Sequence, residues 1–174
     1  MRNWSLILTQ VAPDASSSFV AGLAETLAAA LAKFDLTTSH RQAHFLAQWA
    51  EETAGFAKLC EEASGEAYEG RRDLGNTQPG DGARFKGRGL CMLTGRANYA
   101  SMSKNLAVDF VTHPEIVATF PHALNVAGVY WRDRSLNLFA DRDDLLTITR
   151  RINGGLNGLA ARRQYLARAK AALR

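Results

Sequence analysis

Apolar side chains recur at helical spacing near the start of the chain. They are Phe19, Leu23, Leu27, Leu31 and Phe34, and they follow serines that can cap a helix. This pattern predicts an amphipathic helix with alanine filling the intervening positions. Further helices are predicted at 121–139, 145–152 and 159–173. We therefore expect a mainly α fold.

A second helix is predicted after residues 37–39, and its apolar face carries an acidic residue. The face consists of Phe45, Trp49, Glu52 and Phe56. The neighbouring Glu51 is turned about 100° round the helix and is expected in solvent. Glu52 is therefore the carboxylate that we expect to point inward.

Two environments for Glu52 stay open. Burial beside aromatic rings would raise the pKa of its carboxyl group and keep it protonated, as a proton donor requires. Alternatively, Glu52 forms an ion pair with Arg88 or Arg162. A second carboxylate, Glu61, can cooperate with it only if the helix ends near Gly55. Two carboxylates across a groove can hydrolyse a glycosidic bond.

Residues 63–89 are rich in glycine and polar side chains, which predicts a long irregular centre that forms a cleft. The whole chain, 1–174, is expected to be a single domain, because its length suits one hydrophobic core. Residues 1–38 carry no motif and are expected to form an N-terminal helical packing segment. The functional core is then 39–174.

Several classes of protein are disfavoured by the sequence. Cys60 and Cys91 lie in unrelated segments, as expected of reduced thiols, and no His or Cys spacing indicates a metal site. No apolar stretch reaches the roughly 18 to 20 residues of a membrane span. We read no signal peptide and expect the protein to accumulate in the cytoplasm.

Positive charge is concentrated at the C-terminal end. The net charge is +4, and basic residues but no acidic ones follow Asp144. This end is either a solvated helix face or a surface that attracts a polyanion such as nucleic acid, an anionic wall polymer or lipid headgroups. DNA binding is disfavoured, because no recognition helix accompanies the basic residues.

Three motifs resemble those of glycoside hydrolase family 19, the family of chitinases. They are FLAQWAEETAGF (45–56), FKGRGLCMLTGRANY (85–99) and INGGLNGLAARR (152–163). The intervening AYEGRRDLGNTQPGDG (67–82) resembles the phage and prophage members that act as peptidoglycan endolysins. The resemblance runs from about residue 40 to the C-terminus. It implies a lysozyme-like, two-lobed helical domain with a central substrate cleft.

The resemblance also implies catalytic roles. Glu52 falls on the general acid, Glu61 on the general base, and Thr94 on the residue that positions the attacking water. The implied reaction inverts the anomeric carbon, with the two carboxyl groups about 6.5 to 9.5 Å apart. It requires no cofactor and no metal.

Other residues match or adjoin positions that line the sugar-binding cleft. They are Asn98, Asn153 and Arg162, which match such positions, and Gln48 and Tyr99, which adjoin them. Arg88 and Arg162 can orient carboxylates through paired hydrogen bonds. Tyr68 and Tyr99 either stack on sugar rings or are half-buried core residues.

Two positions depart from the family pattern. Glu51 replaces the usual histidine and adds a second negative charge beside Glu52, while Met92 replaces a glutamine and removes one hydrogen bond to substrate. The expected function is that of a monomeric endolysin of muramidase type. It would cut β-1,4 bonds of the peptidoglycan strand after another factor releases it from the host cytoplasm to the wall. The alternatives are a chitinase that acts on GlcNAc polymers and a catalytically inactive glycan-binding protein.

Overall fold

The computed structural model describes residues 2–174 and is mainly helical, which confirms the predicted fold class. The chain divides into two compact units. Unit 1 comprises Met1–Ala57 with Tyr130–Arg174, and unit 2 is Lys58–Val129. The assignment of residues 1–174 to one catalytic domain stays a prediction.

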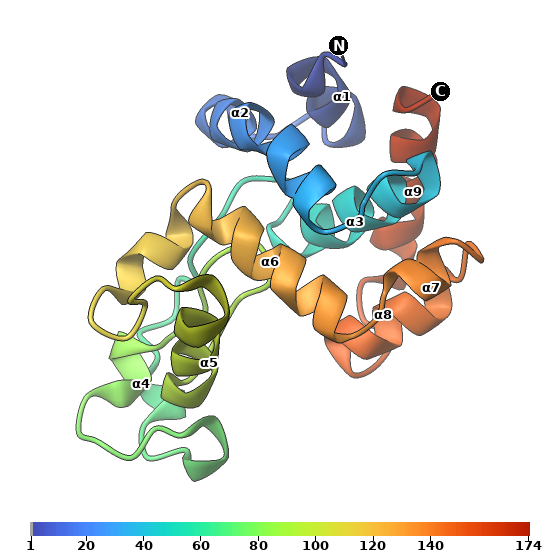
Figure 1. The fold of residues 1–174 in the computed structure, drawn as a ribbon. Helices are drawn as coiled ribbons and strands as arrows, with labels where there is room; N and C mark the ends of the chain where they lie inside the picture. Colours follow the sequence, from blue (N-terminus) through green and yellow to red (C-terminus); the bar gives the residue numbers. More distant parts are fainter. Residues whose placement is uncertain (1) are drawn as a thin grey trace. The chain divides into compact units, whose positions relative to one another are not determined.

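Unit 1 is built from helices at both ends of the sequence (Figure 1). They are α1 (Trp4–Val11), α2 (Ser17–Lys33), α3 (Ser39–Glu52), α7 (Asn137–Ala140), α8 (Leu145–Asn153) and α9 (Leu159–Ala172). α3 packs chiefly against α9, and α1 packs against α9 and α2. The helices expected over 145–152 and 159–173 are confirmed as α8 and α9.

α1 was not predicted, because eight residues give little periodicity to detect. Asn3 caps this helix by accepting a hydrogen bond from the Leu6 N–H at 3.1 Å. Its inner side chains Ile7, Leu8 and Val11 are buried. None of the helices within residues 2–174 has the length and apolar character to cross a lipid bilayer.

α3 is the central helix of unit 1. It begins after Thr38, whose hydroxyl accepts from the Arg41 N–H at 3.2 Å, and every residue from Gln42 to Ala50 is buried. It ends at Glu52, because the backbone of residues 54–56 turns left-handed, with φ of 52°, 77° and 59°. The condition under which Glu61 could cooperate with Glu52, a helix that ends near Gly55, is thus met.

Three aromatic side chains form the core behind α3. The rings of Phe45 and Trp131 meet edge to face at 5.3 Å, and those of Phe45 and Trp49 at 5.7 Å. All three side chains are at most 1% exposed. Because such rings bury a large apolar area in defined rotamers, they fix the helix that carries Glu52.

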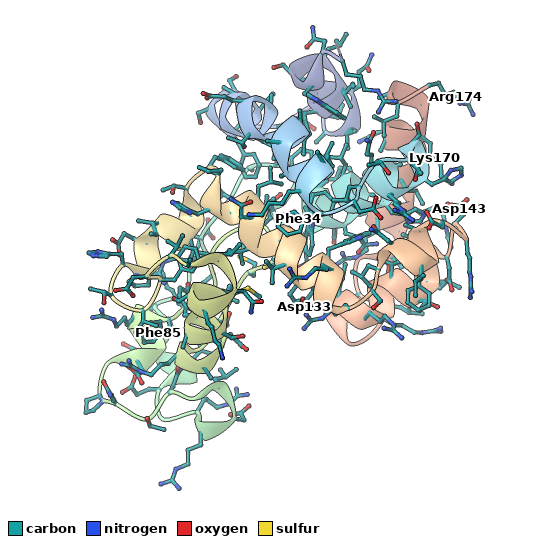
Figure 2. The ribbon with its side chains drawn as sticks, viewed as in Figure 1. Phe34, Phe85, Asp133, Asp143, Lys170 and Arg174 are labelled. Atoms are coloured by element: carbon teal, nitrogen blue, oxygen red, sulfur yellow. The ribbon has the colours of Figure 1, made fainter. Side chains whose placement is uncertain are left out.

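A buried histidine joins α3 to α9 in the same unit. His44 Nε2 lies 2.8 Å from Asp143 Oδ1, and Lys170 Nζ donates to both oxygens of Asp143 at 2.5 and 2.6 Å. Asp143 and Lys170 are labelled in Figure 2. Burial lowers the pKa of His44, and it outweighs the opposite effect of Asp143. The ring's Nδ1 is buried, and none of residues 2–174 forms a hydrogen bond with it.

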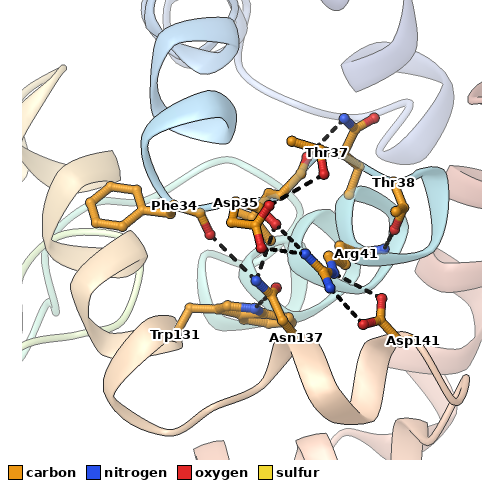
Figure 3. A network of polar contacts seen from close by, with 10 residues as sticks. Phe34, Asp35, Thr37, Thr38, Arg41, Trp131, Asn137 and Asp141 are labelled. Carbon is orange, nitrogen blue, oxygen red and sulfur yellow. Dashed lines mark hydrogen bonds and ion pairs between the residues drawn. The ribbon is translucent and has the colours of Figure 1, made fainter.

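A polar network joins the turn before α3 to α7 (Figure 3). Arg41 donates two hydrogen bonds to Asp141, at 2.7 and 2.8 Å, and also pairs with Asp35 at 2.6 Å. Asn137 accepts from Trp131 Nε1 at 2.8 Å and donates to the Asp35 carbonyl at 3.1 Å. The bonds from Arg41 lower the pKa of Asp141.

Unit 2 has the irregular centre that the sequence predicted. Its elements are η1 (Glu66–Tyr68), η2 (Arg72–Leu74), α4 (Asp81–Arg84), α5 (Arg96–Leu106), η3 (Pro114–Ala118) and most of α6 (His122–Asp133). The part before α5 consists of turns that side chains hold together. α4 packs on η1 and α5 on η2.

Asp81 and Asn76 hold these turns. Asp81 is 1% exposed, and its Oδ2 accepts from the N–H groups of Thr77 and Gln78, at 3.0 Å each, and from Arg96 Nε at 2.8 Å. Asn76 is fully buried; it donates to the Tyr68 carbonyl and accepts from the Arg96 N–H, both at 2.8 Å. These bonds replace the regular backbone pairing that the segment lacks.

Candidate active site

Glu52, in unit 1, pairs with an arginine from α9. Arg162 Nη2 lies 2.5 Å from Glu52 Oε1, while its Nη1 donates to Gln48 Oε1 at 2.6 Å. The Arg162 side chain is 3% exposed and that of Glu52 is 21% exposed. The guanidinium therefore bridges two residues one turn apart on α3. Of the two environments left open by the sequence, the structure shows the ion pair, and the partner is Arg162.

Gln48 is fully buried. Besides accepting from Arg162, it donates to Thr149 Oγ1 at 3.4 Å, and both partners belong to unit 1. Gln48 was expected beside the sugar-binding positions. In the structure its amide holds Arg162 in place, and through it the carboxylate of Glu52.

Glu51 is half-buried, whereas the sequence predicted a solvated residue. Its carboxylate lies against the Cα of Gly158, the residue that precedes α9. A Cβ added to Gly158 would lie 2.2 Å from Glu51 Oε1, far inside contact distance. The periodicity of α3 placed Glu51 away from the aromatic face correctly, but it cannot show which other helix covers that side.

Glu61, in unit 2, receives its hydrogen bonds on one oxygen. Its Oε2 accepts from the Gly87 N–H at 2.8 Å and from the Tyr68 hydroxyl at 3.2 Å. Its Oε1 is buried and has no hydrogen-bond partner within residues 2–174. The main chain adds a further link, because the Glu61 N–H donates to the Gly87 carbonyl at 3.0 Å. The carboxylate is thus fixed with one oxygen left as an open acceptor.

Thr94 lies beside the same glycine. A Cβ on Gly87 would be 2.5 Å from Glu61 Oε2 and 3.5 Å from Thr94 Oγ1. The Thr94 hydroxyl donates to the Met92 carbonyl at 2.9 Å. Unit 2 therefore brings together the residues expected to be the base and the water-positioning hydroxyl. Because Gly87 has no side chain, it leaves room for the Glu61 carboxylate.

Tyr68 was expected either to stack on a sugar or to be half-buried. It is half-buried, and its hydroxyl donates to Glu61. Burial raises the pKa of Tyr68, and the charge of Glu61 raises it further. The phenol therefore stays protonated and remains a donor at neutral pH.

Tyr99 is a core residue, one of its two expected alternatives, and its hydroxyl contacts Arg88. Tyr99 is fully buried against Phe85, donates to the Lys86 carbonyl at 2.8 Å and accepts from Arg88 Nη1 at 3.1 Å. Burial raises the pKa of Tyr99 to about 12. Arg88 Nη1 also donates to the Arg84 carbonyl at 2.8 Å. Because Tyr99 is fully buried, its ring is not available to stack on a sugar, and Arg88 holds the Arg84 and Lys86 carbonyls.

Asn98 and Asn153 are exposed, as substrate-contacting side chains would be. Asn98 donates to the Thr94 carbonyl at 2.7 Å, and Asn153 to the Asn157 carbonyl at 3.4 Å. Asn98 thus lies in unit 2 near Thr94, and Asn153 ends α8 in unit 1. In the part of the chain that the structure describes, no three His, Cys, Asp or Glu side chains gather as metal ligands would.

Comparison with known proteins gives a relative and several solved structures. No protein-family model matches the chain. Over 175 residues it is 30% identical to a protein of Haemophilus influenzae described as a glycosyl hydrolase family 19 domain-containing protein, covering 82% of this chain and 85% of that protein.

Three solved structures share the fold. Chitinase C from Streptomyces griseus is 22% identical with a TM-score of 0.76, covering 99% of this chain and 78% of that one. A bacterial family 19 chitinase is 20% identical with a TM-score of 0.76, covering 97% and 93%. A class IV chitinase from Zea mays is 20% identical with a TM-score of 0.70, covering 98% and 90%.

Proposed function

The chain belongs to glycosyl hydrolase family 19 and is a glycoside hydrolase, and we propose that it cuts β-1,4 bonds in the glycan strand of bacterial peptidoglycan. In this proposal Glu52 is the general acid, Glu61 is the general base and Thr94 positions the attacking water. Both carboxylates act without a covalent intermediate, so the reaction inverts the anomeric carbon.

The one-sided hydrogen bonding of Glu61 is the observation that carries the proposal. Gly87 and Tyr68 occupy Oε2, so Oε1 is the oxygen left to accept a proton from water. A buried carboxylate oxygen without a donor is costly, and a water that donates to it removes this cost. The Thr94 hydroxyl lies near the same carboxylate and can hold that water.

The acid step falls to Glu52. Arg162 occupies Oε1, so the proton is carried on Oε2. As the bond from the anomeric carbon to the leaving oxygen breaks, that oxygen takes the proton of Glu52. Water attacks the anomeric carbon from the opposite face and gives a proton to Glu61. Glu52 ends ionised and Glu61 protonated, and solvent exchange restores both.

Two observations favour peptidoglycan as the substrate. The segment 67–82 resembles the endolysin branch of the family, and the basic C-terminal end suits an anionic wall. The main alternative is chitin, because the similar solved structures are chitinases. A catalytically inactive glycan-binding protein is the non-enzyme alternative, motivated by Glu51 and Met92.

The test compares the protein and its Glu52→Gln variant on peptidoglycan and on chitin. Mass spectrometry of the soluble fragments identifies the sugar at the new reducing end, and NMR identifies its first-formed anomer. Muramic acid as the α-anomer, absent with the variant, is the expected result. Glucosamine at that end would indicate a glucosaminidase, and release from chitin alone would indicate a chitinase. Wall binding without cleavage would mean an inactive binder.

The physiological role that follows is lysis of a bacterial host at the end of a phage cycle. The enzyme would accumulate in the host cytoplasm and reach the wall when another factor opens the membrane. Exposed arginines of the C-terminal end, Arg163, Arg168 and Arg174, would hold it on the anionic envelope. Lys170 contributes less to this attraction, because it pairs with Asp143.

Charge reversal tests this attraction. Changing Arg163, Arg168 and Arg174 together to Glu should weaken binding to isolated walls at low salt and leave little difference at high salt. Cleavage of soluble glycan fragments serves as the control and should not change. Equal wall binding by the variant at low salt would discard the role of this surface.

A further inference from the structure

Two glycines lie where the end of α3 meets α9, and each is covered by a side chain from the opposite segment. The Glu51 carboxylate of α3 lies against the Cα of Gly158, which precedes α9. In the reverse direction, Tyr165 of α9 covers Gly55, where an added Cβ would lie 3.2 Å from the tyrosine hydroxyl. Both glycines have a left-handed backbone, with φ of +70° and +77°. The two contacts form a reciprocal lock.

The Glu51 contact also has an electrostatic side. Gly158 offers no side chain to cap α9, and the first turn of α9 contains no acidic residue. Glu51 brings a carboxylate from another helix to this end, where the aligned peptide dipoles favour negative charge. Both shape and charge therefore favour Glu51 at this position.

Arg162 lies between the two contacts along α9. Its N–H donates to the Gly158 carbonyl at 2.9 Å, so the guanidinium is one helical turn from the residue that Glu51 covers. The fork from Arg162 to Gln48 and Glu52 has bonds of 2.6 and 2.5 Å. A shift of α9 along α3 by a fraction of a turn would break at least one of these bonds.

We propose that Glu51 and Tyr165 are positioning residues that set the register of α9 on α3, and so place Arg162 against Glu52. This assigns a function to the carboxylate that stands where the family usually has histidine. It rests on the acid role proposed above for Glu52. Glu51 itself does not touch the reacting atoms.

A double-mutant cycle with a matched glycine tests the lock. Gly158→Ala puts a methyl group into the Glu51 carboxylate, which has to move aside. Gly154→Ala is the control for stability, since Gly154 has a φ of +72° and open space around an added Cβ. Both variants carry similar backbone strain, and only the first displaces Glu51. Glu51→Ala and the double variant Glu51→Ala/Gly158→Ala complete the cycle.

Gly158→Ala should lower Tm more than Gly154→Ala does. It should also lower kcat about tenfold relative to the native protein, with KM little changed. In the Glu51→Ala background, Gly158→Ala should lower Tm only as much as Gly154→Ala does in the native protein. Glu51→Gln keeps the shape of the side chain, so its kcat should stay within about threefold. Tyr165→Ala and Glu51→Ala should both lower kcat.

The lock would be overturned if Gly158→Ala and Gly154→Ala lowered Tm by the same amount. It would also be overturned if Gly158→Ala lowered Tm equally in the native protein and in the Glu51→Ala variant. A coupled Tm with an unchanged kcat would overturn the positioning role and leave only a packing contact. Failure of the proposed function looks different, because the native protein would then release no fragments from either polymer, whatever the Tm cycle shows.

Discussion

The main-chain N–H of Gly87 points at Glu61 Oε2 from 2.8 Å, and the Cα of the same glycine is covered by that oxygen. Gly87 thus donates a hydrogen bond to the Glu61 carboxylate, and because it has no side chain it also leaves room for that carboxylate. The Tyr68 hydroxyl approaches the same oxygen at 3.2 Å. This geometry separates the two oxygens of Glu61 into one that is held and one that is open.

Gly87→Ala should displace Glu61 with little effect on the backbone. The new methyl group would stand 2.5 Å from Oε2, and the φ of Gly87 is not among the left-handed values. A misplaced catalytic group costs on the order of 100-fold, so kcat should fall by about that factor. Steady-state kinetics and circular dichroism give the measurement. A variant with native kcat would show that Glu61 is not needed where it lies.

Tyr68→Phe should lower kcat about three- to tenfold and leave KM unchanged, because it removes a single hydrogen bond and keeps the ring. In a Glu61→Gln background the same change should have almost no further effect. If Tyr68 instead stacks on a sugar, Tyr68→Phe will be neutral and Tyr68→Ala will raise KM. The four variants separate the two roles.

Arg162→Lys should lower kcat strongly, although lysine keeps the positive charge. A lysine ammonium cannot reproduce the planar fork that holds Gln48 and Glu52 together. We expect kcat to fall at least about 100-fold and Tm to fall with it, since a buried partner is left incompletely paired. Arg163→Lys, on the exposed neighbour, is the matched control and should behave as the native protein.

His44 should make stability fall in mild acid. Burial lowers its pKa below the ordinary 6.5, so the unfolded chain binds the proton before the folded chain does. The contribution of His44 to the free energy of unfolding is complete above pH 6.5. Below that pH it declines by up to about 1.4 kcal/mol for each pH unit, as long as the folded ring stays neutral.

Chemical unfolding between pH 7.5 and 5 checks this pH dependence. His44→Gln should flatten the profile, whereas His40→Gln, on the exposed start of α3, should keep the native slope. Equal slopes in the native protein and His44→Gln would refute the assignment. The window stays above the range in which Asp143 titrates, since hydrogen bonds from Lys170 and His44 lower its pKa overall although burial opposes them.

Four helices, α2, α3, α8 and α9, and the inward turn of Glu52 could be predicted, because they depend on spacing within one segment. The aromatic face of α3 and the end of that helix near Gly55 are properties of consecutive residues. Arg162 was one of two arginines named as a possible partner of Glu52, and spacing alone could not choose between it and Arg88. The irregular nature of residues 63–89 followed from their glycines and turn residues.

Contacts between distant segments could not be predicted in the same way. That Glu51 covers Gly158 depends on the register between α3 and α9, which spacing within α3 does not contain. The burial of Gln48 and Tyr99 likewise depends on what packs around them. The approach of the Glu61 carboxylate to Gly87 is a contact of the same kind, because 26 residues separate the two.

Unit 1 consists of two separate stretches of the chain, so its two parts are synthesised at different times. Arg162 follows Glu52 by 110 residues, and all of unit 2 is translated between them. A ribosome therefore exposes the proposed acid long before the guanidinium that holds it exists. A growing chain has both carboxylates but not the paired form of Glu52, and a chain that stops before α9 never acquires it. The proposed acid is assembled only after α9 has been made, so chains that lack α9 carry no paired Glu52.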